Sequence, residues 1–284
     1  MDTLRGSLLM VLAMGAFALE DMFIKSAASS LPVGQILILF GLGGMVIFAG
    51  LARAQGHAPW HPGFGTRTML WRSLAEVAGR LCYTLAIALT PLSSASAILQ
   101  ATPLVVAAGA VVFFGETVGW RRWLAIGLGF AGVLLILRPG LSGFEPASLF
   151  AVAGTLGFAG RDLATRAAPK DMSNHQLGFL GFAMLVVAGG IALGWTGGAV
   201  WPAPRNWLDI AAATVIGVIA YNALSGAMRA GEISVIAPFR YTRLVFAMVL
   251  GVLVFGERPD ALTLIGSAVI VGSGVFTLLR SRKA

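Results

Sequence analysis

Residues 33–52 read VGQILILFGLGGMVIFAGLA, an uncharged run that ends at Arg53. Twenty residues of helix rise about 30 Å, which is the thickness of the hydrocarbon core of a bilayer. The rest of the chain shares this composition, because 57% of its 284 residues are hydrophobic and only 11% are charged. Soluble domains carry about 25% charged residues. The sequence therefore predicts an all-α membrane protein and excludes a disordered chain.

Apolar runs separated by charged or turn-forming residues predict ten transmembrane helices joined by short loops. They cover residues 4–24, 33–52, 68–89, 93–113, 120–137, 147–166, 176–194, 207–229, 234–255 and 261–280. The first run has the Arg5 and apolar stretch of a signal peptide. Glu20, Asp21 and Lys25 are untypical of a cleavage region, so we expect it to remain as the first helix.

The net charge of +8 comes from basic residues that favour one side of the membrane. With the N-terminus inside, twelve of them are cytoplasmic: Arg5, Arg53, Arg67, Arg72, Arg121, Arg122, Arg166, Lys170, Arg229, Arg280, Arg282 and Lys283. Four lie outside: Lys25, Arg138, Arg205 and Arg258. Cytoplasmic loops carry the excess of lysine and arginine. We therefore expect a multi-pass protein of the bacterial inner membrane with both termini in the cytoplasm.

The chain also repeats itself at an offset of 141 residues. Phe-Ala-x-x-Asp-x-x-x-Lys at 17–25 falls on Phe-Ala-x-x-Asp-x-x-x-Arg at 158–166, and Phe-Gly-Glu at 114–116 falls on 255–257. Five helices per half is an odd number, so the second half is inverted, a pattern common in secondary transporters. The predicted units are residues 1–140 and 141–284, two inverted five-helix repeats with a substrate site between them.

Four motifs suggest a family. They are Phe-Gly-Glu at 114–116 and 255–257, Ala-x-x-Leu-Thr-Pro-Leu at 86–92 and Ile-Ala-Pro-Phe-Arg-Tyr at 236–241. With these, essentially the whole chain resembles the ten-helix drug/metabolite transporters of the EamA type, and within them bacterial exporters of amino acids, including aromatic ones. The resemblance implies export of small metabolites through a central cavity. The segment from Glu76 to Arg80 departs from the mostly apolar or small residues expected there.

Ionisable residues inside a membrane are expensive and are functional candidates by default. Glu76 and Arg80 lie four residues apart, so they either form a polar wall of the cavity or pair with each other. Arg240 and Arg243 share a helix face, and either could bind a substrate carboxylate. Arg240 could instead snorkel to the cytoplasmic surface.

The repeat relates Asp21 to Asp162 and Glu20 to Arg161. We expect each aspartate to pair with the base four residues further along its own helix, Lys25 or Arg166. The alternative is that the two aspartates are equivalent gate latches. Either Glu20 or Arg161 could serve the ammonium or carboxylate of a substrate.

Uncharged polar residues extend the predicted site. Membrane tyrosines usually lie at the interfaces, whereas all three tyrosines here fall within spans. Their hydroxyls therefore face a cavity or form interhelical hydrogen bonds. The predicted uncharged substrate-binding residues are Tyr83, Gln100, Tyr221, Asn222 and Tyr241. Pro103 and Pro238 each remove a helical hydrogen bond, and we expect their kinked helices to act in gating.

Two further features read as structural. The glycine-rich fifth and tenth spans are expected to pack together as a scaffold. Glu116 and Glu257 are expected to cap a helix start or to anchor a loop.

Other classes of function fit less well. His57 and His61 have the spacing of a zinc pair but lie in a loop, and Cys82 is the single cysteine, so we expect no metal site. No Gly-x-Ser-x-Gly elbow or phosphate-binding loop with a lysine is present, which argues against an enzyme or an ATP-driven pump. An ion channel suits the scattered mixed charges less well than alternating access. We expect small zwitterions and membrane lipid as partners, no nucleic acid, no cofactor and a monomer.

Overall fold

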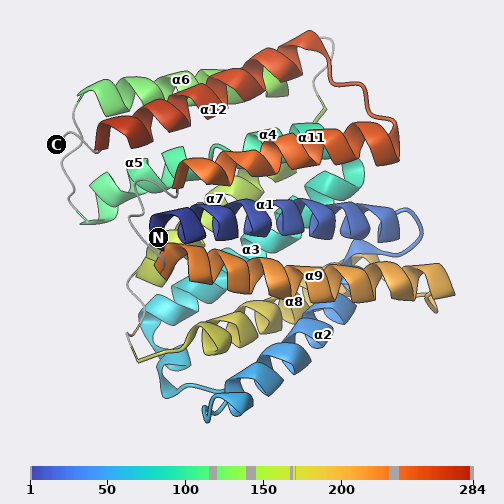
Figure 1. The fold of residues 1–284 in the computed structure, drawn as a ribbon. Coiled ribbons are helices and arrows are strands. Elements are labelled where there is room, and N and C mark those ends of the chain that lie inside the picture. The colour runs from blue at the N-terminus through green and yellow to red at the C-terminus, as the bar shows by residue number, and fades with distance from the viewer. Residues whose placement is uncertain are drawn as a thin grey trace.

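The computed structural model describes residues 2–114, 120–138, 145–166, 169, 171–229 and 237–281. These residues form helices and contain no strand. The elements are α1 (Asp2–Ala27), α2 (Val33–Ala54), the 3-10 helix η1 (Pro62–Gly65), α3 (Arg67–Leu89), α4 (Leu92–Leu99), α5 (Thr102–Phe114), α6 (Trp120–Leu137), α7 (Ser148–Arg166), α8 (Asn174–Thr196), α9 (Pro204–Arg229), the 3-10 helix η2 (Ala237–Tyr241), α11 (Thr242–Phe255) and α12 (Ala261–Ser281). The start of α1 and the end of α12 lie at the same end of the bundle (Figure 1).

Local sequence sets several helix ends. Ser173 and Gln176 form a capping box that starts α8, with Ser173 Oγ accepting from the Gln176 N–H at 3.2 Å. The sequence Thr90-Pro91 ends α3, because Pro91 has no N–H to donate to the Ile87 carbonyl, which instead accepts from Lys25 Nζ at 3.0 Å.

The helices pack in pairs that join the two halves of the sequence. The most extensive pairings are α2 with α8, α1 with α9, α3 with α7, and α6 with α12. Figure 1 shows α6 and α12 side by side along one edge of the bundle, which confirms the predicted packing of the fifth and tenth spans. Glycines allow the close approach, since a Cβ on Gly132 would lie 2.8 Å from the Gly266 carbonyl oxygen.

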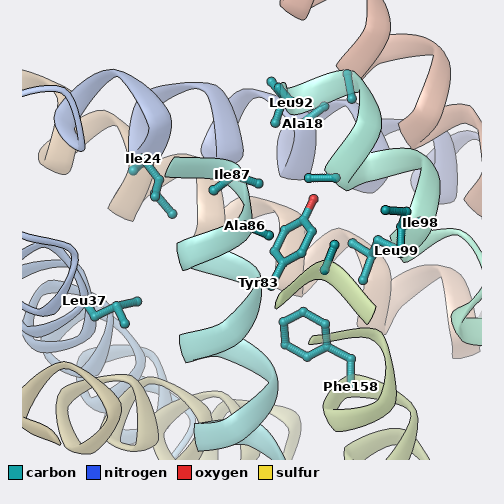
Figure 2. Close-up of a cluster of buried hydrophobic side chains, with 14 of the residues drawn as sticks. Ala18, Ile24, Leu37, Tyr83, Ala86, Ile87, Leu92, Ile98, Leu99 and Phe158 are labelled. Carbon is teal, nitrogen blue, oxygen red and sulfur yellow. The ribbon is translucent and has the colours of Figure 1, made fainter. Parts of the chain in front are cut away.

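A buried apolar core surrounds Tyr83 where α3, α4 and α7 meet. Figure 2 shows the Tyr83 ring between Phe158 and the Ile98–Leu99 end of α4, with its hydroxyl pointing away from Phe158. The Tyr83 and Phe158 rings pack edge to face with centroids 5.9 Å apart. This core fixes α3 beside α7, and these two helices carry Arg72, Glu76, Arg80, Arg161 and Asp162.

Five helical stretches are long and apolar enough to cross a membrane by length and composition: Leu4–Ala27, Val33–Ala54, Leu92–Phe113, Asn174–Thr196 and Pro204–Leu224. Shorter apolar stretches lie in α6 and α12. The polar residues Glu76 and Arg80 lower the mean hydropathy of α3, and Arg161 and Asp162 do the same in α7. The described structure therefore supports a helical membrane protein without fixing the number of spans at ten.

Candidate functional site

Two buried carboxylates on α1 bind arginines from two other helices. Glu20 Oε1 lies 2.9 Å from Arg80 Nη1 of α3, and Asp21 Oδ2 lies 2.6 Å from Arg243 Nη2 of α11. The Tyr83 hydroxyl lies 3.3 Å from both Asp21 Oδ2 and Ser96 Oγ. We call Glu20, Asp21, Arg80, Tyr83, Ser96 and Arg243 the Asp21 cluster. Because a buried charge needs a partner, these pairs hold α1, α3 and α11 together.

A second set of charges gathers around α7. Arg161 Nη2 binds Asp162 Oδ1 at 2.7 Å, and Arg161 Nη1 lies 3.5 Å from Glu76 Oε1 of α3. Arg240 Nη2 lies 3.6 Å from Asp162 Oδ2. Arg72 Nε donates to Thr165 Oγ1 at 2.9 Å, and Arg72 Nη2 lies 4.0 Å from Glu76 Oε2. We call Arg72, Glu76, Arg161, Asp162, Thr165 and Arg240 the Asp162 cluster.

The pairing of Asp21 with Lys25 was wrong, and of the two alternatives for Glu76 and Arg80 the mutual ion pair does not form. Glu76 and Arg80 do not pair with each other, because Arg80 turns to Glu20 and Glu76 turns to Arg161 and Arg72. Asp21 binds Arg243 instead of Lys25. Asp162 binds Arg161 and Arg240, while the side chain of Arg166 lies outside the described residues. For Glu20, Asp21 and Arg80 the partner comes from a neighbouring helix, whereas the shortest ion pair of Asp162 is with the adjacent Arg161.

Lys25 instead joins a third polar group at the end of the bundle. Its Nζ donates to the carbonyls of Thr90 at 2.6 Å and Ile87 at 3.0 Å, and lies 3.7 Å from Glu257 Oε1. The Glu257 carboxylate accepts hydrogen bonds from the N–H of Leu92 at 2.5 Å and of Ser93 at 3.0 Å. Glu257 therefore caps the start of α4, as predicted. Glu116 lies outside the described residues.

The spans predicted at 93–113 and 234–255 are not continuous α-helices. The first divides into α4 and α5 near Gln100, and Thr102 Oγ1 donates to the Leu99 carbonyl at 2.6 Å, the acceptor that Pro103 leaves without a helical partner. The second divides into η2, which contains Pro238, and α11. Gln100 Nε2 lies 3.4 Å from the Arg240 carbonyl oxygen, so the two breaks meet beside the Asp162 cluster.

Of the remaining predicted residues, Tyr221 lies near the Asp162 cluster, whose charges interact with its hydroxyl. The Tyr221 ring packs edge to face on Phe48, with centroids 5.3 Å apart. Asn222 donates to the Val218 carbonyl at 2.9 Å, and its Oδ1 lies 3.2 Å from Nε2 of His175, so it links α9 to α8. The Tyr241 hydroxyl is buried and has no hydrogen-bond partner among the described residues.

Charge is distributed unequally between the clusters. The Asp21 cluster holds two guanidiniums and two carboxylates, whereas the Asp162 cluster holds three guanidiniums and two carboxylates. Arg240 has the most exposed side chain of the five arginines, at 29%, and shares Asp162 with Arg161. Arg240 is therefore the described guanidinium best placed to accept another anion.

Sequence reasoning missed Arg72, which was assigned to the cytoplasmic segments. Its side chain is buried, and it packs beside Glu76 and Thr165. The spacing of Arg72, Glu76 and Arg80 at four-residue intervals was an available signal, because it places all three on one face of α3.

Two hollows lie outside the clusters. An apolar groove of about 280 Å³ runs between α5 and α7 and is lined by residues that include Val105, Phe113 and Leu163. A polar hollow of about 190 Å³ lies beside Glu257 and Ser93. In the part of the chain that the structure describes, no three His, Cys, Asp or Glu side chains gather as metal ligands.

A helical membrane bundle with paired charges at its centre and two broken helices is the architecture of a multi-pass transporter. A family model described as the EamA-like transporter family matches residues 4–138 and 146–279. The chain therefore belongs to the EamA-like transporter family, and it is a multi-pass membrane protein that transports small metabolites.

Relatives and a solved structure agree with this assignment. The chain is 28% identical over 281 residues to the pseudopaline exporter CntI of Pseudomonas aeruginosa, covering 98% of this chain and 97% of that protein. It is 26% identical to the riboflavin transporter of Rhizobium johnstonii, covering 96% and 90%. It is also 26% identical to the S-adenosylmethionine uptake transporter of Rickettsia bellii, covering 75% and 72%.

A solved crystal structure with 21% sequence identity matches 99% of this chain and 98% of its own with a TM-score of 0.66. At that identity the likeness concerns the fold alone. The named relatives are transporters and not enzymes, which supports a non-enzymatic function, and they include both an exporter and an uptake transporter.

Proposed function

We propose that this chain is a secondary transporter of the bacterial inner membrane that exports amino acids or similar small zwitterions from the cytoplasm by alternating access. The single observation that carries the proposal is the position of Arg240. Its guanidinium lies 3.6 Å from a carboxylate that Arg161 already holds at 2.7 Å, and it stands where the two broken helices meet. A planar guanidinium with a weak partner suits a substrate carboxylate.

In this proposal the substrate carboxylate takes the place of Asp162 on Arg240. Arg161 and Arg243 are less suited to that task, because each already binds a carboxylate within 2.7 Å. Glu76, whose contacts are 3.5 and 4.0 Å long, faces the substrate ammonium. Gln100, Tyr221 and Tyr241, with nearby apolar residues, hold the substrate side chain.

The same proposal includes ten membrane crossings in two inverted halves, residues 1–140 and 141–284. Two observations support it. The family model matches one range in each half, 4–138 and 146–279. The pairing of α1 with α9 and that of α3 with α7 are also exchanged by the 141-residue offset. The breaks near Pro103 and Pro238 then let the halves rock against each other.

A transporter of another small metabolite is the alternative. The riboflavin transporter of Rhizobium johnstonii favours it, because riboflavin is not an amino acid. S-adenosylmethionine, named for the Rickettsia relative, is an amino-acid derivative and favours the zwitterion.

Counterflow into liposomes tests the substrate without assuming a direction of transport. Vesicles containing the purified protein are loaded with excess unlabelled amino acid and given a trace of the labelled one outside. We expect protein-dependent accumulation that an added pH gradient changes if transport is proton-coupled. If riboflavin-like compounds accumulate and no amino acid does, the amino-acid proposal is excluded and the alternative, transport of another small metabolite, is supported.

The variant Arg240→Gln tests the carboxylate site. Losing a charge-assisted contact of about 2 kcal/mol should raise the apparent KM by roughly thirtyfold. The matched control is Arg205→Gln, because Arg205 is 79% exposed and pairs with Asp209 at the start of α9. An unchanged KM for Arg240→Gln at equal expression would exclude Arg240 as the carboxylate ligand.

A further inference from the structure

Three hydrogen bonds tie the loop after α11 to the start of α4. Glu257 accepts from the N–H groups of Leu92 and Ser93, and Ser93 Oγ donates to Glu257 Oε2 at 2.8 Å. Gly256 has a φ of +64°, so it turns the chain and returns Glu257 to the helix end. The Glu257 carboxylate packs directly against Gly251, where a Cβ would collide with it. The contact therefore depends on two glycines in the second half of the chain.

Lys25 adds the ends of α1 and α3 to this contact. Its ammonium bridges the Ile87 and Thr90 carbonyls to Glu257, and its side chain is 15% exposed. We call Lys25, Thr90, Leu92, Ser93 and Glu257 the Glu257 clasp. The clasp joins residues separated by 164 and 165 positions in the sequence, so it links the two halves of the bundle.

The clasp lies between the Asp21 cluster and a polar hollow. Lys25 lies one helical turn beyond Asp21 on α1, which is about 6 Å along the helix axis. On its other side the clasp borders the polar hollow of about 190 Å³ that Ser94, Arg138 and Asp260 also line. The clasp therefore lies between the buried Asp21 cluster and the polar hollow, which is lined in part by the exposed residues Glu145 and Asp260.

The sequence repeats the residue types of this contact. Lys25, Ser93 and Glu257 correspond, at the offset of 141, to Arg166, Ser234 and Glu116. Those three side chains lie outside the described residues. Because a base, a serine and a glutamate recur together at the same offset, the two halves of the sequence share this set of three residue types.

We propose that the Glu257 clasp is the gate that keeps this end of the translocation path closed, and that its release opens the path toward the Asp21 cluster. The proposal rests on the alternating-access function above. Two halves that rock apart at one end must break the contacts that join them there. Glu257 is a positioning residue in this scheme, since it holds α4 against α11 and is not required to touch the substrate.

Thiol accessibility tests the gate without a substrate. Cys82 is the single cysteine, so Cys82→Ser gives a background into which Ser96→Cys places a reporter one turn beyond Ser93 on α4. A membrane-impermeant maleimide is added from the side of the clasp. We expect Glu257→Gln to raise the labelling rate of this reporter roughly tenfold, the factor that loss of one charge-assisted contact supplies.

Two controls define the result. Glu145→Gln removes an exposed carboxylate that borders the same hollow, and it should leave the rate unchanged. A Ser29→Cys reporter on the exposed turn after α1 should label equally in every variant. If Glu257→Gln fails to fold, Ser93→Ala removes only the hydroxyl donor and should give a smaller rise in labelling.

An unchanged rate in folded Glu257→Gln and Ser93→Ala proteins would overturn the gate. That outcome is distinct from a failure of the transport proposal. If Glu257→Gln raises the labelling rate but the protein shows no amino-acid counterflow, the gate proposal stands and only the proposed substrate is excluded.

Discussion

Glu20 and Asp21 are adjacent in the sequence, yet they bind arginines of two different helices. Glu20 reaches Arg80 of α3, and Asp21 reaches Arg243 of α11. Both carboxylates are almost fully buried. In each pair, both charges lose their hydration and are compensated only by each other. Removing one partner would therefore leave the other charge buried and unpaired. Two adjacent residues thereby fix the positions of three helices.

A double-mutant cycle tests the Glu20–Arg80 pair. Glu20→Gln alone should destabilise the protein by about 3 kcal/mol, because it leaves the Arg80 charge buried and unpaired. Adding Arg80→Gln should recover part of that loss. Thermal unfolding in detergent measures both, with Arg53→Gln at the exposed end of α2 as a surface control expected within about 0.5 kcal/mol of the parent. Strictly additive single effects would show that the two side chains do not interact.

Which charges gather could be read from the sequence, but their pairing could not. Glu20, Arg80, Arg161 and Arg243 stand out because they interrupt apolar runs. The expected partner four residues along the same helix was wrong for Asp21, and the alternative pairing of Glu76 with Arg80 does not occur, because the sequence does not say which helices become neighbours. The substrate roles of these residues stay predictions.

At the scale of helices, glycine contacts decide how closely the pairs approach. A Cβ on Gly189 of α8 would lie 2.5 Å from the Gly34 carbonyl oxygen of α2, whereas one on Gly190 would meet nothing within 4 Å. Backbone atoms cannot move aside as a flexible side chain can. Gly190 therefore tolerates a side chain, whereas the adjacent Gly189 does not.

The variants Gly189→Ala and Gly190→Ala form a matched pair. Gly189→Ala should destabilise the protein by roughly 1–3 kcal/mol through overpacking. Gly190→Ala should be neutral or stabilising by up to about 1 kcal/mol, because alanine is the better helix former. Thermal unfolding of both proteins decides the matter, and equal effects would contradict the close approach of α2 and α8.

The loop before α12 offers a prediction about pH. Asp260 accepts a hydrogen bond from Arg138 and another from the Thr263 N–H, and these contacts lower the pKa of Asp260 to about 2. An unfolded aspartate has a pKa of about 3.9. Because the folded pKa is the lower one, the stabilisation is complete above pH 4 and is lost as the pH falls toward 2.

The stability difference between the parent and Asp260→Asn should therefore be constant from pH 7 to pH 5. It should shrink below about pH 4, where the carboxylate of the unfolded chain becomes protonated. Thermal unfolding as a function of pH measures it. A difference that grows on acidification would show that Asp260 is not held ionised by Arg138.

Helix positions were largely predictable, and helix interruptions were not. The runs predicted at 33–52 and 68–89 agree closely with α2 and α3, because apolar length and flanking charges set those ends. The interruption at Gln100 falls inside an uncharged stretch whose mean hydropathy stays high, so hydropathy does not locate it. Pro103 predicted the kink, but the division into two helices depends on the packing of α4.

At the scale of the whole molecule, the distribution of basic residues predicts orientation. With Arg72 assigned to α3, eleven lysines and arginines fall on one predicted side against four on the other, so we expect both termini in the cytoplasm. A reporter that fluoresces only in the cytoplasm should be bright when fused to either terminus. A dark fusion at one terminus, with normal expression, would mean an odd number of crossings and would contradict two five-helix halves.

The family could be recognised from the sequence, whereas substrate and direction could not. The Phe-Gly-Glu motif at 255–257 lies at the end of α11, away from Arg240, and the relatives include both an exporter and an uptake transporter. In the proposed function the substrate is selected by a few side chains around Arg240, whose neighbours come from helices distant in the sequence.

The charges of α3 also bear on how the polypeptide is made. This helix carries Arg67, Arg72, Glu76 and Arg80, and it leaves the ribosome before Arg161, which follows Glu76 by 85 residues. A nascent segment with buried charges partitions poorly into lipid by itself. We therefore expect stable integration of α3 to be delayed until α7, which carries Arg161, has been synthesised. On this expectation, α3 is the last helix of the first half of the chain to integrate stably into the bilayer.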